Sequence, residues 1–563
     1  MRTRRAGFCA FGLAFLTLMA GPAELPPEKE KWFEARSAHF SFVTDGGERE
    51  VLEQSRSLET LYEVLKVISP DLQKRKFQPR VQMPSHVYMF SSDKEFTSYS
   101  QLRGIEGFFV THPDGYYMSV ASGRDNATGV VYHEYLHQFL QVNFPGVPPW
   151  LNEGLACFFQ TMQMDGKEVR LGGPPEGYLY QLQSAGLMPV SRLLAVTPTS
   201  PDYTTDPARG QFYASTWLLT HYLMTGDEAG RAQLGTYLDL IRAGRSPEES
   251  FQRGFGRTPA SLDQELRFYL NLMRARKTIK TWILQFKTLT IDPAFSYRAL
   301  PRPEALGRLG LLLVTGDQAF RDRGRKHFDA ALALDPHSAT GNLGRGLLAM
   351  EENHPAELGP CFAAAVQGDP DDAMLQYFAG VGIMQTAYEK KATPDELQAD
   401  RAQARGHLLR SVALGCPYPD ALQQLAALVL GDEHPSTEEL GQLEEACRRL
   451  PGFFHLKLNL AILYARASQL PLARLRLGEV AAQTADPELA QRAAGMLQSL
   501  DNQEADRLGR KANDAFQQKN YGEAVAALEE AIRLATDARL QMDLQEALKN
   551  MKILIELRTK TRR

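Results

Sequence analysis

The stretch VYHEYLHQFLQVNFPGVPPWLNEGLACFF, from Val131 to Phe159, decides the interpretation of the first half of this chain. It contains His133, Glu134 and His137 in an H-E-x-x-H pattern, followed by Glu153. Residues four apart lie on the same face of a helix, about one turn from each other. The two imidazoles would therefore lie close enough together to hold one ion.

The residues around this motif predict a helix, a tight turn and a returning helix. Residues 130–144 have the periodicity of an amphipathic helix. The Pro and Gly residues at 145–149 end that helix, and a second helix is expected to begin near Leu151 with Glu153 in its first turn. The alternative is that the two histidines are ordinary helix residues and that Glu153 complements the positive helix N-terminus.

The residue types indicate the metal and the chemistry. Imidazole nitrogens suit zinc, and a catalytic zinc takes three protein ligands and keeps a fourth position for water. His133, His137 and Glu153 are therefore the predicted ligands of one zinc ion. Glu134 would lie beside the metal-bound water and remove its proton as a general base.

A tyrosine and a set of predicted strands are expected to lie near a cleft beside the motif. Tyr213 begins an apolar helix at 212–224, where its hydroxyl would stabilise a developing oxyanion. A core aromatic with a hydrogen-bonded hydroxyl is an equal alternative. Residues 39–44, 86–90 and 116–120 read as strands. The last of these is either an edge strand that pairs with an extended peptide or part of an ordinary internal hairpin.

The N-terminus predicts export. Residues 1–5 are basic, residues 6–20 are apolar, and small residues follow at 21–23, as in a secretory leader spanning 1–23. The apolar run is shorter than the roughly 20 residues that a membrane span needs. We therefore expect a periplasmic or extracellular protein, with an uncleaved membrane anchor as the alternative.

Composition narrows the class of protein. A chain of 563 residues with 44% hydrophobic and 23% charged residues is typical of soluble globular domains. The formal net charge of −4 gives no indication of a nucleic-acid partner. Cys157, Cys361, Cys416 and Cys447 share no metal-binding spacing and lie in apolar helical patterns, so small buried hydrophobes are the expected role.

The second half of the chain is repetitive. A bulky residue, a small residue and a proline recur 34 residues apart, as Phe328, Ala331 and Pro336 and again as Phe362, Ala365 and Pro370. The same frame continues, with insertions, at Leu409, Val412 and Pro417, at Leu443, Ala446 and Pro451, at Ala473, Leu477 and Val480, and at Ala524, Leu528 and Ala531. This period resembles the tetratricopeptide repeat, whose helix pairs stack into a solenoid that binds partners on its concave face.

The first domain resembles the gluzincin group of zinc metallopeptidases, in its peptidase-MA-like branch. The likeness covers residues 32–275 and is carried by the phrases HEYLHQF (133–139), PPWLNEGLACFF (148–159), FYASTWLLTHYL (212–223) and ESFQRGFGRTPASLDQELRFYL (249–270). It implies zinc at His133, His137 and Glu153, with Glu134 as base and proton shuttle and Tyr213 as oxyanion donor.

The expected fold is an α+β zincin-like metallopeptidase domain at 32–290 followed by an all-α tetratricopeptide-type solenoid at 300–563. The expected function is that of an exported zinc-dependent peptidase whose repeats recruit a substrate or partner protein. Two alternatives stay open. The first is an interaction scaffold with a catalytically silent metal domain, and the second is a zinc hydrolase acting on something other than peptides.

Overall fold

The computed structural model describes two compact units, residues 1–397 and 398–563, which we treat separately. The predicted leader lies outside the described residues, and the predicted domain boundary between 290 and 300 stays a prediction. The described ranges are 25–73, 84–100, 105–122, 126–144, 146–226, 228–242, 245–276, 279–286, 295–416, 418–430, 436–449, 453–484 and 486–560.

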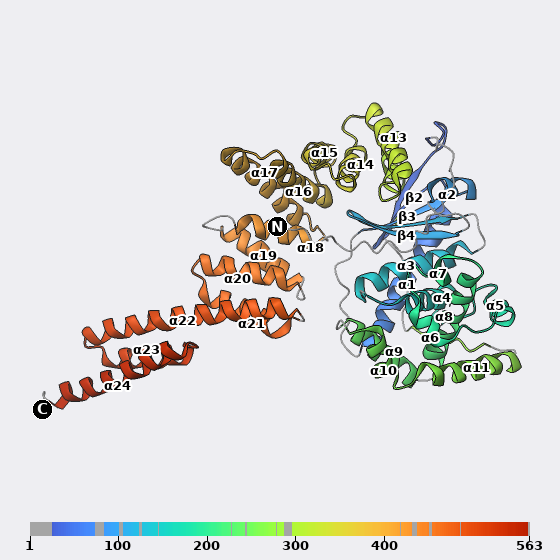
Figure 1. The fold of residues 1–563 in the computed structure, drawn as a ribbon. Helices are drawn as coiled ribbons and strands as arrows, with labels where there is room; N and C mark the ends of the chain where they lie inside the picture. Colours follow the sequence, from blue (N-terminus) through green and yellow to red (C-terminus); the bar gives the residue numbers. More distant parts are fainter. Residues whose placement is uncertain are drawn as a thin grey trace. The chain divides into compact units, whose positions relative to one another are not determined.

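A mixed sheet organises the first unit (Figure 1). It has six strands, in the order β4-β5-β3-β2-β1-β9. Its strands are β1 (Phe33–Arg36), β2 (Phe40–Thr44), β3 (Ser85–Phe90), β4 (Gly107–His112), β5 (Gly115–Ala121) and β9 (Ser296–Ala299). The pairs β2–β3 and β3–β5 are parallel, and the remaining pairs are antiparallel. Every residue of β3 is buried, as expected of an apolar central strand. The three predicted strands are confirmed.

Helices on this sheet position the motif. The helix α3 (Ala127–Asn143) packs against β4 and β5, and α4 (Pro149–Gln160) packs against both α3 and α8 (Ala208–Thr225). The remaining helices of this part are α1 (Glu48–Gln73), α2 (Asp93–Tyr99), α5 (Tyr178–Ser184), α6 (Val190–Ala195), α7 (Pro201–Thr204), α9 (Glu228–Arg242), α10 (Pro247–Phe255) and α11 (Pro259–Arg276). A small sheet in the order β6-β7-β8 (Gln163–Asp165, Glu168–Leu171, Trp282–Gln285) joins the segments that follow α4 and α11.

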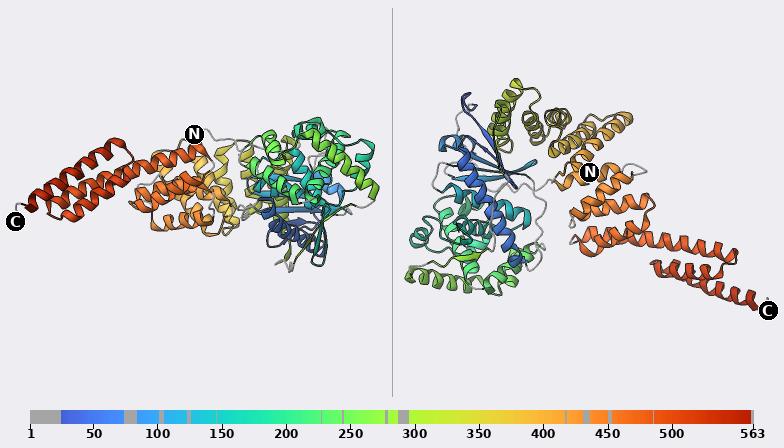
Figure 2. Two further views of the ribbon diagram at one scale, coloured as in Figure 1. Left: turned by 90° about the horizontal axis from the view of Figure 1, so that it is seen from below. Right: turned by 180° about the vertical axis from the view of Figure 1, so that it is seen from behind.

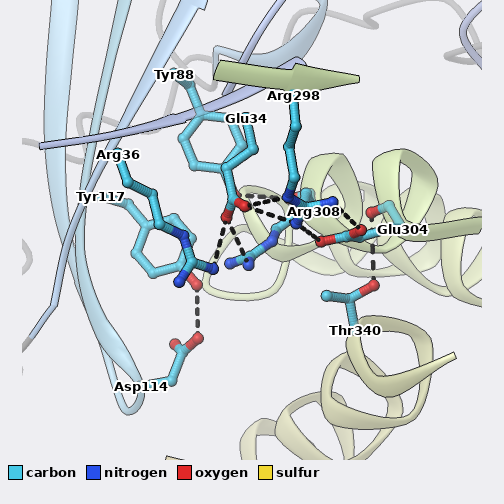
Figure 3. Close-up of polar contacts among 9 residues, drawn as sticks. All are labelled: Glu34, Arg36, Tyr88, Asp114, Tyr117, Arg298, Glu304, Arg308 and Thr340. Carbon is cyan, nitrogen blue, oxygen red and sulfur yellow. Dashed lines mark hydrogen bonds and ion pairs between the residues drawn. The ribbon is translucent and has the colours of Figure 1, made fainter. Parts of the chain in front are cut away.

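Ion pairs join the large sheet to α12 (Arg302–Leu311), the first helix after β9 (Figure 3). Glu34 on β1 contacts Arg308 on α12, with 3.1 Å between Oε1 and Nη2. The hydroxyl of Tyr88 on β3 donates to the carbonyl oxygen of Arg308 at 2.8 Å. The sheet and the beginning of the helical part therefore share one polar joint.

Within each unit, most consecutive helices of the helical part pack against the next one in sequence (Figures 1 and 2). In the first unit these are α12, α13 (Gln318–Leu334), α14 (Ala339–Glu351), α15 (Pro355–Gly368) and α16 (Ala373–Glu389). The helix α17 (Pro394–Ala413) crosses the boundary, and the second unit holds α18 (Pro419–Val429), α19 (Thr437–Arg449), α20 (Phe454–Arg466), α21 (Leu470–Gln483), α22 (Pro487–Gln517), α23 (Tyr521–Leu534) and α24 (Ala538–Lys560). The prediction of an all-α part built of stacked helices is confirmed, and its assignment to the tetratricopeptide type stays a prediction.

The bulky residue of the predicted repeat frame is buried in every repeat except the one in α17. Its bulky residues are buried as predicted at Phe328, Phe362, Leu443, Leu477 and Leu528. The prediction of Leu409 as the buried residue of α17 is wrong, because Leu408 is buried there. The inserted residues lengthen α17 to 20 residues. Because each residue turns a helix by about 100°, the buried face moves with helix length and the fixed offset fails.

No helix within the described ranges combines the length and hydropathy needed to cross a lipid bilayer.

Candidate metal centre

The motif helix α3 has one face buried in the core and another facing a cleft. Val131, Tyr135, Leu136, Phe139 and Leu140 are buried. His133, Glu134 and His137 instead line the cleft. The two histidines therefore share a face, as their spacing of four predicts.

The helix α4 begins two residues earlier than expected. Pro149 occupies its first turn, where the fixed φ of proline suits a helix start, and the extended Pro148 precedes it. Glu153 consequently lies in the second turn, so the expectation that it lies in the first is wrong. The alternative role as a complement to the helix N-terminus also fails, because that effect is confined to the first turn.

The three predicted ligands come together. The Glu153 Oε2 atom lies 3.3 Å from His133 Nε2 and 3.7 Å from His137 Nε2. One atom from each residue lies within 4.8 Å of the other two. The Glu153 side chain is 1% exposed, and among the described residues its Oε2 has no hydrogen-bond partner. Two imidazoles and an unpartnered buried carboxylate oxygen are a donor set that fits a zinc ion.

Each of the three predicted ligands also contacts a residue outside the ligand set. The Nδ1 atom of His137 lies 3.2 Å from Asn152 Oδ1, which accepts its hydrogen. The other imidazole, His133, has its Nδ1 4.0 Å from Cys157 Sγ. The hydroxyl of Tyr203 donates to Glu153 Oε1 at 2.5 Å. Such outer partners fix the orientation of ligands and raise metal affinity.

The electrostatics set the protonation of these groups. Burial raises the pKa of Glu134, although the neighbouring imidazoles oppose the shift. Burial also acts to raise the pKa of Glu153, but His137 and His133 outweigh it and the pKa falls to about 2. The pKa of His133 lies well above its usual value because Cys157 and Glu153 outweigh the effect of burial. Glu153 is therefore ionised at neutral pH, as a metal ligand must be.

The motif opens into a cleft of about 1080 Å³ that β4 borders. Of the two alternatives for residues 116–120, the structure has the internal hairpin strand and not the edge strand, because β5 lies between β4 and β3. The hairpin places β4 at the edge instead. A Cβ on Gly107 of β4 would collide with Val130 and lie 3.5 Å from Glu134 Cγ, so the absent side chain lets the edge strand approach α3.

Tyr213 lines the same cleft from α8. Its ring stacks on the His133 ring, with 6.3 Å between centroids and 12° between planes. Burial raises its pKa well above the usual value, with Glu153 adding to the effect. The helix α8 packs closely on α4, and this packing fixes the position of Tyr213. A Cβ on Gly154 of α4 would lie only 2.8 Å from the Thr216 carbonyl oxygen on α8. Its role as oxyanion donor stays a prediction.

The site contacts of Asn152, Tyr203, Cys157 and Tyr178 were not predicted from the sequence. Tyr203 lies on the short helix α7 in a Pro- and Thr-rich segment without clear periodicity. Cys157 is buried, as expected of a small hydrophobe, but it also contacts His133 and lies 3.2 Å from the Tyr178 hydroxyl. One signal was present, because Cys157 follows Glu153 by four residues and shares its helix face.

Comparisons with known proteins add little about this site. No family model and no curated protein matches the chain. Among solved structures, it is similar to YrrB, "a TPR protein with an unusual peptide-binding site", at 21% identity over 34% of this chain and 91% of that one, with a TM-score of 0.28. The human IFIT1 dimer with m7Gppp-AAAA is 13% identical over 61% of this chain and 83% of that one, with a TM-score of 0.20. Superpositions this weak support no functional inference.

Proposed function

We propose that this protein is a zinc-dependent peptidase with a zincin-like metal domain. The observation that carries the proposal is the convergence of His133 Nε2, His137 Nε2 and the unpartnered Glu153 Oε2 on one point. A zinc ion bound there would polarise a scissile carbonyl and lower the pKa of a bound water. Glu153 Oε2 faces two imidazoles, and a cation bound among the three side chains would stabilise the buried carboxylate once those imidazoles are neutral.

The residues around this point would divide the work of hydrolysis. Glu134 would accept the proton of the attacking water and deliver it to the leaving amine. Tyr213 would donate a hydrogen bond to the carbonyl oxygen as negative charge develops on it. The outer edge of β4, which pairs with no further strand among the described residues, would pair with an extended peptide, and this favours a peptide over another hydrolysable substrate. The intact Glu134 also favours catalysis, since a structural metal site needs no base.

The test is a cleavage profile of a proteome-derived peptide library with wild-type protein and with Glu134→Gln. We expect about one zinc per chain in both proteins and a loss of cleavage by roughly 10²–10⁴-fold in the variant. Glu176→Gln, at an exposed position, is the matched control and should cleave normally. Wild-type protein that binds no zinc would exclude the proposal.

The second candidate function is an interaction scaffold with a catalytically silent metal domain. The helical part supports it, because α12 to α24 make up the rest of the chain after β9 and such stacked helices commonly bind proteins or peptides. Affinity capture with wild-type protein and with Glu134→Gln separates the two functions. A scaffold would retain the same partners and the same cellular role in both, whereas a peptidase would accumulate uncleaved substrate on the variant.

We further propose that the protein is exported, on the basis of the basic and apolar residues at 1–20. Cell fractionation combined with N-terminal sequencing of the mature protein tests this. A new N-terminus near residue 23 in the soluble exported fraction would support a cleaved leader. An intact Met1 in the membrane fraction would support an uncleaved anchor, and an intact Met1 in the cytoplasm would exclude export.

A further inference from the structure

The short helix α7 places one tyrosine against the carboxylate of the metal centre. Tyr203 is 9% exposed. Its ring lies 5.8 Å from the ring of Phe212 and 6.2 Å from that of Tyr213, centroid to centroid. On the surface, Arg192 Nη2 binds Asp202 Oδ1 at 2.6 Å and fastens α7 to α6. The aromatic contacts of its ring and this surface ion pair together hold Tyr203 in place.

This arrangement gives the two oxygens of Glu153 different surroundings. Its Oε1 accepts the Tyr203 hydroxyl at 2.5 Å. Its Oε2 faces both imidazoles and, within the described part of the chain, has no hydrogen-bond donor. A hydrogen-bonded oxygen has one lone pair engaged and is held away from the ligand position. The carboxylate therefore presents a single free oxygen to the point where the ligand atoms meet.

We infer that Tyr203 is a positioning residue that restricts Glu153 to one ligand oxygen, an inference that rests on the zinc site proposed above. Two imidazoles and a carboxylate bound through both oxygens would fill four coordination positions. Binding through one oxygen leaves the fourth position open to water, as a catalytic zinc site requires. The Tyr203 hydroxyl thus keeps the site open, although it would touch neither substrate nor metal.

The neighbouring tyrosine provides a matched comparison. Tyr203 and Tyr213 lie in the same aromatic group, and each Tyr→Phe change removes one hydroxyl and keeps the ring. Tyr203→Phe should weaken zinc affinity by about 10–100-fold, the usual effect of removing an outer partner of a ligand. The Tyr213 hydroxyl bonds to that of Tyr203 and, among the described residues, to no ligand, so Tyr213→Phe should weaken zinc affinity much less than Tyr203→Phe does. It should lower kcat, because an oxyanion donor acts on the reacting carbonyl.

The experiment uses the full chain, stripped of metal and titrated with zinc against a chromophoric chelator. The same proteins loaded with cobalt(II) report coordination number through their visible spectra. We expect the wild type and Tyr213→Phe to give intense four-coordinate spectra, and Tyr203→Phe to give a weaker spectrum of higher coordination number. Circular dichroism of the metal-free proteins checks that the fold is retained.

An unchanged spectrum and zinc affinity in Tyr203→Phe would overturn the inference. Should that variant fail to fold, the cobalt(II) spectrum of the wild type takes its place, and a weak spectrum of coordination number above four there overturns the inference equally. Wild-type protein that binds zinc without cleaving any peptide would defeat the proposed peptidase and leave the role of Tyr203 to be decided by the spectra. Wild-type protein that binds no metal would defeat both.

Discussion

Two buried glutamates of the first unit, Glu34 in the sheet and Glu153 in α4, have opposite surroundings. Both are nearly inaccessible, at 2% and 1% exposure, and both have a lowered pKa despite burial. Glu34 has both oxygens satisfied, with Oε1 held by Arg36 and Arg308 and Oε2 by Arg298 (Figure 3). Glu153 has one oxygen satisfied, and the other faces two imidazoles.

This difference in partners separates a carboxylate that stabilises the fold from one that is proposed to bind a metal. Guanidinium groups stay protonated at all ordinary pH values, so Glu34 has permanent partners and no capacity left for a ligand. Imidazoles can lose their protons to make room for a metal. The Oε2 atom of Glu153, which faces the two imidazoles, is therefore the proposed ligand position, whereas the Glu34 cluster joins the sheet to α12.

The largest expected effect is on metal binding. Glu153→Gln removes the charged ligand, and zinc affinity should fall by more than the roughly 10–100-fold that loss of an outer partner costs. Cleavage should be lost with it. Metal analysis and chelator competition measure the first effect, and Glu34→Gln, which should bind zinc normally, is the control. Equal zinc content in wild type and Glu153→Gln would remove the distinction between the two carboxylates.

The second effect is on stability. Glu34→Gln leaves the Arg308 guanidinium, whose side chain is 16% exposed, without its charged partner. Breaking a buried pair in this way costs about 3–5 kcal/mol of the free energy of unfolding. Urea denaturation measures it. The control is Glu63→Gln, which breaks the exposed pair with Lys66 and should cost under about 1 kcal/mol. Equal costs in the two variants would contradict a buried structural role.

The third effect is the pH dependence of the stability that the Glu34–Arg308 pair contributes. The arginines hold the pKa of Glu34 below its ordinary value even though burial opposes them. Its stabilising effect is therefore complete above the unfolded-state pKa of about 4.3 and is lost as pH falls through the lower folded-state pKa. The difference in unfolding free energy between wild type and Glu34→Gln should stay constant from neutral pH down to the unfolded-state pKa of about 4.3, and then shrink as the pH falls toward the lower folded-state pKa. A difference that shrinks already near neutral pH would contradict this assignment.

The sequence predicted the metal centre better than the Glu34 cluster because the first is local. His133 and His137 lie one helical turn apart and Glu153 follows on the next helix, so helix geometry alone nearly places them. Glu34 meets Arg298 and Arg308, which are more than 260 residues away in the chain. No periodicity links β1 to β9 and α12, since that pairing depends on how the sheet closes.

The failures near the site have the same physical origin. The hairpin expected at 116–120 is present, but which of its strands lies at the edge depends on β3, which is distant in sequence and pairs with β5 in parallel. Tyr203 reaches Glu153 across 50 residues from a segment with no periodic pattern. Local motifs fix the ligands, whereas tertiary packing selects the residues that orient them.

The smallest effect concerns the position of Glu153 and leaves its charge unchanged. In Gly154→Ala the new Cβ would collide with Thr220 and lie 2.8 Å from the Thr216 carbonyl oxygen, which forces α4 and α8 apart. Overpacking of this kind costs about 1–3 kcal/mol of stability, and cleavage should fall because α8 carries Tyr213.

Gly441→Ala in α19 is the matched control for that change, because nothing lies within 4 Å of its added Cβ. There the helix should gain about 0.5–1 kcal/mol, since alanine loses less backbone entropy on folding than glycine. Thermal unfolding and peptide cleavage of both variants give the comparison. If Gly154→Ala is as stable and as active as Gly441→Ala, the spacing of α4 and α8 does not hold the metal centre in place, and the ligands are positioned by their own hydrogen bonds.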